Sequence, residues 1–170
     1  DGSQLTTFNY DAENRLTSIG FPGGGSNTFT YYGNGLRRSK VDSIGTTNYY
    51  YDGDDLIAES DGAGGWRGSY VQGALGLVSR LYSPQPAEWY TWWHHGNYIG
   101  TVNMVSVGGV VEQSYEYDAF GVPLSEPPIA ATPFRYVGQL GYYKDPDHRM
   151  MLLGARYYDP WLGRFITQDP

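Results

Sequence analysis

Three aspartates toward the C-terminal end of the sequence are of the type that acid–base chemistry uses, and each directly precedes a proline: Asp145, Asp159 and Asp169. Arg156 lies three residues before the second of them and could orient a carboxylate. Two carboxylates that share one proton can polarise a water molecule or a peptide carbonyl, because like charges in close contact cannot both ionise. An Asp-Pro pair is also a common start of a turn. We therefore favour a structural role for these residues, with Arg156 pairing with a carboxylate, over the catalytic one.

The sequence offers little for metal or cofactor chemistry. Cys is absent, and two of the three histidines, His94 and His95, are adjacent. On a strand they would point to opposite faces and could not chelate one ion together. His148 stands beside Asp147 in a turn-like stretch, and the glycine run at 23–25 predicts a turn because no Lys-Ser/Thr pair follows it. We expect neither a metal site nor a cofactor.

Composition favours an all-β protein. The chain has 170 residues, of which 16% are aromatic and only 17% charged, with 17 Tyr and 24 Gly. Tyr, Trp and Thr favour strands, and Gly serves the turns between them. Disordered chains, in contrast, are poor in aromatic residues and rich in charge.

The charge balance argues against nucleic acid as a partner, because phosphate binding needs clustered Lys and Arg, whereas the net charge is −7. No stretch approaches the roughly 18 apolar residues of a membrane helix, so we expect no membrane span. The first residues have no signal-peptide pattern. A cytoplasmic protein, non-classical export and a fragment of a longer chain all remain open.

Three stretches share one pattern, in which an alternating strand ends in a tyrosine, a short polar turn follows, and the next strand opens with leucine. They are FNYDAENRLTSIG (8–20), FTYYGNGLRRSKVD (29–42) and YYYDGDDLIAES (49–60), anchored by Tyr10, Tyr31 and Tyr51. We expect antiparallel hairpins side by side, with Leu16, Leu36, Leu56 and the strand aromatics forming the core.

The turns of this repeat have a local chemistry. Asp11 and Asp52 are expected to accept hydrogen bonds from backbone amides two residues further on. In the middle unit Tyr32 stands where Asp would be expected, so that side-chain cap should be lost.

The second half keeps strands and turns but changes its motifs. We predict a strand ending near His94, a turn at 95–97, a strand at 98–107, a hairpin at Gly108-Gly109 and a strand at 110–117. One domain, 1–170, would thus comprise repeats (1–83), long strands with a hairpin (84–124), a Pro-rich loop (125–133) and a last segment (134–170).

The order of these motifs is specific. The repeats are followed by YEYDAFG (115–121) and then by FRYVGQLGYYKDPDHRMMLLGARYYDPWLGRFITQDP (134–170). This arrangement resembles the YD-repeat, or Rhs, family, which includes bacterial polymorphic toxins, the C components of insecticidal Tc complexes and the animal teneurins. The resemblance covers essentially the whole chain, and its last part is similar to the Rhs-repeat-associated core region.

The resemblance implies a β-sheet strip that spirals into a hollow shell around a toxin domain of the same polypeptide. It also implies that aspartates of the core region cleave the chain further downstream, a role that Asp145, Asp159 and Asp169 would take here, with Arg156 nearby. The implied protein is secreted or lies at the cell surface. Its partners would be the rest of its own polypeptide and a toxin cargo.

Three functions follow as alternatives. The first is a structural and encapsulating module, non-enzymatic as it stands, cut from a longer chain. The second is a self-assembling subunit of an extracellular filament or sheath, because an unpaired first strand is an edge that invites a copy of the chain. The third is an aspartyl autoprotease region whose cleavage site lies downstream.

The densest aromatic cluster is EWYTWWHH (88–95). Strand alternation places aromatic side chains of this stretch on both faces, which favours burial on both sides. A protein interface and a carbohydrate platform are the alternatives, since Tyr and Trp suit both.

Overall fold

The computed structural model of the chain describes residues 5–85, 88–127 and 132–167. These residues form β-strands and turns, with one short 3-10 helix, η1 (Gly138–Leu140). The all-β, antiparallel fold expected from the sequence is confirmed. Within the described ranges, no helix has the length and apolarity needed to cross a membrane.

Eleven strands form one antiparallel sheet in which each pairs with its neighbours in the chain, so the strand order is the sequence order. We call this sheet the hairpin ladder. Its strands are β1 (Thr7–Tyr10), β2 (Leu16–Gly20), β3 (Ser26–Tyr31), β4 (Arg37–Asp42), β5 (Gly45–Asp52), β6 (Asp55–Asp61), β7 (Trp66–Gly73), β8 (Gly76–Gln85), β9 (Glu88–Gly96), β10 (Val102–Val107) and β11 (Val110–Ser114).

Two smaller sheets follow. One pairs β12 (Glu116–Tyr117) with β13 (Pro123–Ser125). The other has four strands in sequence order, β14 (Tyr143–Lys144), β15 (Met151–Leu153), β16 (Arg156–Asp159) and β17 (Arg164–Phe165). We call residues 132–167, which include the four-stranded sheet, the C-terminal segment.

A five-residue turn recurs along the chain. At Asp11, one carboxylate oxygen accepts from the amides of Glu13 and Arg15, at 3.0 and 2.9 Å. The Asp11 amide also donates to the Arg15 carbonyl, and Asn14 has a positive φ of 62°, a conformation that favours Asn or Gly. The same arrangement of side chain and backbone occurs at Asp61, Asn97 and Asp118.

The turns confirm some expectations and correct others. The Asp11 cap forms, and Tyr32 opens the same turn with no carboxylate, as expected. The prediction of a cap at Asp52 was wrong, because Asp52 pairs with Asp55 across a two-residue loop that is too short for this five-residue turn. The strand predicted at 98–107 begins only at Val102, because the turn opened by Asn97 occupies the residues before it.

The repeat tyrosines join successive hairpins. The Tyr31 hydroxyl donates to the Leu16 carbonyl at 2.6 Å, and the Tyr51 hydroxyl donates to the Arg37 carbonyl at 3.1 Å. Their apolar neighbours Leu16, Leu36 and Leu56 are all buried, which confirms the leucines of the predicted core. The predicted burial of the strand aromatics holds only in part, because Phe8, Tyr10 and Tyr50 remain about 40% exposed. In the two units anchored by Tyr31 and Tyr51, the tyrosine ring packs against the core, and its hydroxyl bonds to the backbone of the preceding hairpin.

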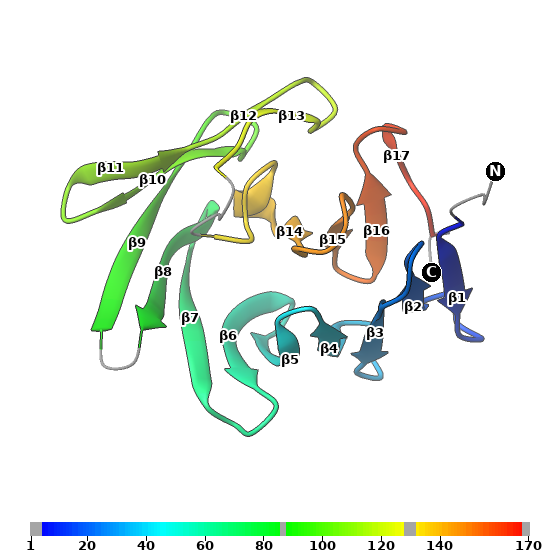
Figure 1. The fold of residues 1–170 in the computed structure, drawn as a ribbon. Helices are drawn as coiled ribbons and strands as arrows, with labels where there is room; N and C mark the ends of the chain where they lie inside the picture. Colours follow the sequence, from blue (N-terminus) through cyan, green and yellow to red (C-terminus); the bar gives the residue numbers. More distant parts are fainter. Residues whose placement is uncertain (1–4, 86–87, 128–131, 168–170) are drawn as a thin grey trace.

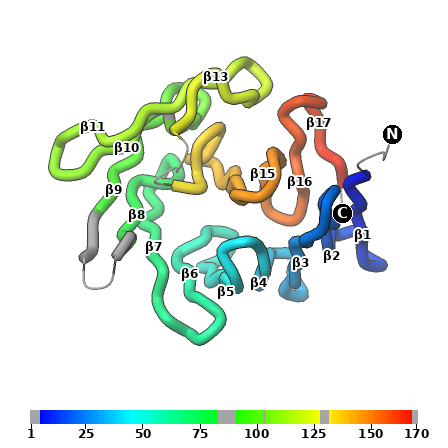
Figure 2. The backbone as a smooth tube through the Cα atoms, in the orientation of Figure 1, coloured from blue at the N-terminus to red at the C-terminus, as the bar shows by residue number. Residues whose placement is uncertain are grey.

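The ladder is strongly curved, and the C-terminal segment lies in its hollow (Figures 1 and 2). The main core lies between them. Tyr70 and Tyr49 of the ladder contact Phe134 and Tyr143 edge to face, with centroids 5.1 and 5.6 Å apart. A smaller cluster of Val102, Val105 and Tyr115 lies beyond it, with Trp92 packed against it.

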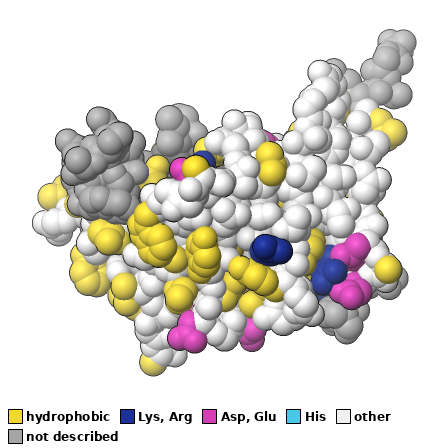
Figure 3. Space-filling view, turned by 90° about the horizontal axis from the view of Figure 1, so that it is seen from below, with side chains coloured by type: hydrophobic (Ala, Val, Ile, Leu, Met, Phe, Trp, Pro, Cys, Tyr) yellow, Lys and Arg dark blue, Asp and Glu magenta, His cyan; other side chains and the backbone are white. Residues whose placement is uncertain are grey.

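The opposite face of the ladder is seen in Figure 3, where hydrophobic side chains lie among uncharged ones with few charges between them. Exposed apolar side chains on these strands include Val41, Tyr50, Ile57 and Val71. In the aromatic cluster, Trp92 is partly buried in the core, whereas Trp93 remains 47% exposed. The side chains of Trp89 and Tyr90 fall outside the described part.

Candidate functional site

The backbone of the C-terminal segment is tied to the ladder near η1. The Val102 amide donates to the Arg135 carbonyl at 2.7 Å, and the Gln139 amide donates to the Gly100 carbonyl at 3.0 Å. Phe134 also forms an isolated bridge with Tyr143. These contacts place β14 in the hollow of the ladder, against its inner face (Figure 1).

At the centre of the contact, Arg37 of β4 binds the carboxylate of Asp145 through both of its terminal nitrogens. Nη1 lies 2.5 Å from Oδ2, and Nη2 lies 3.2 Å from Oδ1. The same guanidinium donates to the hydroxyls of Tyr157 and Tyr49, at 3.1 and 2.9 Å. Arg37 is 1% exposed and Asp145 0%, so this two-pronged pair is fully enclosed by protein.

Lys40, also on β4, completes the site. Its Nζ lies 2.9 Å from Asp145 Oδ1 and 2.6 Å from Asp42 Oδ2. Ordinary alternation would place positions 37 and 40 on opposite faces of a strand. A bulge opposite Tyr31 shifts the register, since Tyr31 pairs with Arg37 whereas Thr30 pairs with Ser39. The extra residue lets Arg37 and Lys40 face the same side.

The charges fix the protonation state of Asp145. Burial alone would raise the pKa of its carboxyl group, but Arg37 and Lys40 outweigh burial and hold that pKa well below its ordinary value of 3.8. Conversely, the charge of Asp145 outweighs burial and raises the pKa of Arg37. A carboxylate held ionised in this way is a poor proton donor, because general acids work with a pKa near the ambient pH.

A second polar contact lies on the neighbouring strands. The Tyr143 hydroxyl donates to Glu59 Oε1 of β6 at 2.8 Å, and Arg80 Nη2 of β8 lies 3.5 Å from Glu59 Oε2. The Arg37 guanidinium stacks over the ring of Tyr143 at 4.9 Å. We call Arg37, Lys40, Glu59, Tyr143 and Asp145 the docking network, because it joins the inner face of the ladder to the C-terminal segment.

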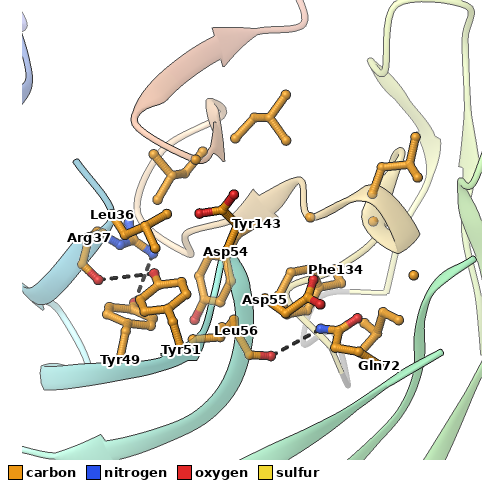
Figure 4. A pocket seen from close by; sticks show the side chains of 18 of the residues that line it. Leu36, Arg37, Tyr49, Tyr51, Asp54, Asp55, Leu56, Gln72, Phe134 and Tyr143 are labelled. Carbon is orange, nitrogen blue, oxygen red and sulfur yellow. Dashed lines mark hydrogen bonds between the residues drawn. The ribbon is translucent and has the colours of Figure 1, made fainter. Parts of the chain in front are cut away.

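A cavity of about 560 Å³ opens beside the docking network. Figure 4 shows Arg37, Tyr49 and Tyr51 at one end, and Phe134 and Gln72 at the other. The ladder supplies one wall and η1 with β15 supplies the other, mostly through leucines. This cavity lies between the two parts of the molecule and has a mixed lining, with Asp54, Asp55 and Gln72 beside the apolar side chains.

The carboxylates predicted for catalysis have separate surroundings. Asp159, at the end of β16, is held by Arg149, whose Nη2 lies 2.7 Å from Oδ2, while its Oδ1 accepts from the Trp161 amide at 3.0 Å. Arg156 stacks over the Phe165 ring at 4.1 Å. Asp169 falls outside the described residues.

Asp145 and Asp159 are thus each bound to cations of their own, Arg37 with Lys40 in one case and Arg149 in the other. In the structure both carboxylates make structural contacts, and their catalytic role stays a prediction. His94 bonds to Thr132 and His95 to Ser106. Within the described ranges, no group of three His, Asp or Glu residues is arranged to hold a metal ion.

Sequence reasoning missed most of the docking network. Arg37 and Lys40 stood in the quoted repeat, but period-two alternation gave no reason to place both inside. A signal was present in RRSKVD, because successive residues of a strand point to opposite faces, so one of the adjacent Arg37 and Arg38 had to face the core side. Its partner, 108 residues later, could not be identified from one sequence.

Comparison with known proteins gives relatives for the whole fold. No protein-family model matches the chain. The tRNA nuclease WapA of Bacillus subtilis (strain 168) is 32% identical over 171 residues, covering 96% of this chain. The tRNA3(Ser)-specific nuclease WapA of Bacillus spizizenii is 30% identical over the same length. The chain spans only 7% of either protein.

Solved structures show the same fold at lower sequence identity. A Photorhabdus luminescens Tc holotoxin pore has a TM-score of 0.72 and 16% identity, and the TcdB2–TccC3 crystal structure has a TM-score of 0.70 and 16% identity. Each match covers 97% of this chain and 9% of the other. Together with the hairpin ladder and its tyrosine anchors, these similarities support the Rhs, or YD-repeat, family at a coarse level, and they mark the chain as similar to a short stretch of large toxin proteins of this type.

Proposed function

We propose that this chain is a structural module of a secreted or cell-surface Rhs-type toxin, in which the hairpin ladder is part of an enclosing wall. The C-terminal segment closes the hollow of that wall, and the enclosed partner is another part of the same polypeptide. The observation that carries the proposal is the docking network, which fixes the C-terminal segment inside the curve of the ladder.

A buried ion pair is suited to fixing one arrangement. Apolar contacts such as Phe134 on Tyr70 tolerate small shifts, but a charge removed from water must keep its partner, because leaving it unpaired costs several kcal/mol. Asp145 meets two cations on one strand, so a shift of the segment along the ladder would separate all three charges. Encapsulation requires such a fixed position.

The test is limited proteolysis of the chain within its natural longer polypeptide. The parts outside residues 1–170 should be cut at least about tenfold more slowly in the assembled protein than when expressed alone. Arg37→Met should speed the cutting, whereas Arg38→Met, an exposed neighbour on the same strand, should leave it unchanged. Equal rates for enclosed and free parts would contradict encapsulation.

Self-assembly into a filament or sheath is a second candidate, favoured by the two ends of the ladder. Among the described strands, β1 and β11 each have a partner on one side and none on the other, and such edges offer unpaired amides and carbonyls to another strand. The 170-residue chain should then form ordered multimers in light scattering. A mass that stays monomeric as concentration rises would exclude this function.

Intramolecular aspartyl cleavage is the third candidate and falls mainly on Asp159, because the pKa of Asp145 is held too low for a proton donor. Asp159 is 4% exposed and lies just before the last described strand. In a chain extended by its natural continuation, Asp159→Asn or Asp169→Asn should abolish a cut that the wild-type chain makes. An extended wild-type chain that stays intact would exclude the role.

A further inference from the structure

A second cavity of about 580 Å³ lies on the other side of Tyr143, whose ring also lines the first. Strands β4–β8 with the turn between β4 and β5 supply one wall, and residues 126–127 together with residues of 132–146 supply the other. We call it the basic cavity after its charged lining: Lys40, Arg67, Arg80, Arg135, Lys144, Glu59 and Glu126.

Positive charge exceeds negative charge in this cavity, although the chain as a whole has a net charge of −7. Lys40 is bound by Asp42 and Asp145, which do not line the cavity. The four remaining cations face two carboxylates, leaving an excess of two positive charges.

The two carboxylates are already shared. Glu126 binds Arg135 at 2.6 Å and Lys144 at 3.5 Å, and it also accepts from the Tyr117 hydroxyl. Burial, followed by the nearby charge of Arg135, lowers the pKa of Lys144, as expected where cations outnumber acids.

Two cations have donors that point to a missing anion. Arg67 Nη1 donates to the Thr47 hydroxyl at 3.1 Å instead of to a carboxylate. Arg135 is 7% exposed, and its Nε is buried without a hydrogen-bond partner among the described residues. Buried guanidinium donors are normally satisfied, so the orphaned Nε of Arg135 favours an anionic group nearby, and Arg67, which is only partly buried, lies on the wall of the same cavity.

Two exposed apolar side chains line the cavity. They are Trp66, which is 54% exposed, and Ile44, which is 59% exposed. Exposed apolar side chains beside buried cations match a short peptide in which an acidic residue is flanked by apolar ones. A nucleic acid would instead bring many phosphates against a surface whose net charge is negative.

We propose that the basic cavity binds the carboxylates of a short acidic peptide segment, with Arg67 and Arg135 as the groups that hold them and Trp66 and Ile44 covering the flanking apolar residues. This inference does not depend on encapsulation, since the cavity is complete within the chain. The charge excess fits a segment with two adjacent acids.

The experiment is calorimetric titration of the 170-residue chain at low ionic strength with a blocked Leu-Asp-Glu-Leu peptide. The uncharged counterpart Leu-Asn-Gln-Leu should bind at least about tenfold more weakly. Arg67→Gln should lower affinity for the acidic peptide about tenfold, the loss typical of one charge-assisted hydrogen bond. Arg67→Lys should retain part of the affinity.

Arg38→Gln is the matched control, because it removes the same charge from an exposed position of β4 outside the cavity. It should leave binding unchanged, and circular dichroism checks that both variants fold. Equal binding of the two peptides, an equal loss in both Gln variants, or no binding of the acidic peptide would overturn the proposal. Tighter binding of inorganic phosphate or of a single-stranded RNA decamer would overturn it in favour of a phosphate ligand.

Discussion

The contacts within the hairpin ladder join residues close in the chain, whereas those between the ladder and the C-terminal segment join residues far apart in it. In the ladder, Asp11 bonds to amides two and four residues away, and Tyr31 reaches a carbonyl 15 residues away. In the docking network, Asp145 bonds to Arg37 across 108 residues and to Lys40 across 105. The ladder is thus specified by local contacts, whereas the docked segment depends on charges that lie more than one hundred residues apart in the chain.

Removing one member of the docking network should have the largest effect on stability. Arg37→Met leaves Asp145 without its two-pronged partner and two buried tyrosine hydroxyls without their donor, so the free energy of unfolding should fall by roughly 3 kcal/mol. Urea unfolding measures the loss, with Arg38→Met as the control. A loss below about 1 kcal/mol would mean that the long-range contacts matter no more than the local ones.

The pH dependence of stability should distinguish the contribution of His94 from that of Asp145. Burial, together with the charge of Arg80, lowers the pKa of His94 to about 4. The unfolded chain therefore binds a proton near pH 6.5 that the folded chain refuses until about pH 4. Stability should fall as pH drops through this window, by about 3 kcal/mol at most.

His94→Gln should flatten the curve between these two pH values, as measured by thermal unfolding in a pH series. The pKa of Asp145 is also depressed, so its contribution is complete above its ordinary value of 3.8 and is lost only below it. A wild-type curve that is flat from pH 6.5 to 4 would contradict the burial of a neutral His94.

Loss of a turn cap should have a smaller effect. Asp61 accepts from the amides of Ala63 and Gly65 at 2.9 and 2.7 Å, so Asp61→Ala should cost about 1 kcal/mol, whereas Asp61→Asn should keep most of the stability. The midpoint of chemical unfolding reports both variants. An equal loss in the two would show that charge rather than the hydrogen-bond geometry matters at this turn.

The smallest effect is expected at the border of the core. Tyr51→Phe removes the hydroxyl that donates to the Arg37 carbonyl and keeps the ring, so it should cost about 0.5 to 1 kcal/mol. Burial raises the pKa of Tyr51 to about 12, so this hydroxyl keeps its proton over the whole range of ordinary buffers. Tyr98→Phe is the control, because Tyr98 is 97% exposed. An equal loss of stability in Tyr51→Phe and Tyr98→Phe would mean that the Tyr51 hydroxyl does not contribute to the stacking of hairpins.

The same difference in range explains what the sequence could predict. Alternation, turn residues and the Tyr-to-Leu repeat were enough for the all-β fold and for the burial of Leu16, Leu36 and Leu56, because each depends on neighbours in the chain. The predicted cap at Asp52 was wrong because the length of the loop, not the residue type, decides which turn forms. The docking network could not be predicted because it depends on a bulge at Arg37 and on a partner more than one hundred residues away.

The consecutive strand order of the ladder has a consequence for how such a protein changes in length. Because each strand from β1 to β11 pairs only with its neighbours in the chain, a duplicated hairpin can be added without rethreading any part of the sheet. Such additions must come two strands at a time, since a single extra strand would reverse the direction of everything after it. Gene duplication in multiples of one hairpin, about 20 residues, would then change the length of the ladder in fixed steps, while the docking network keeps its place near the C-terminal segment.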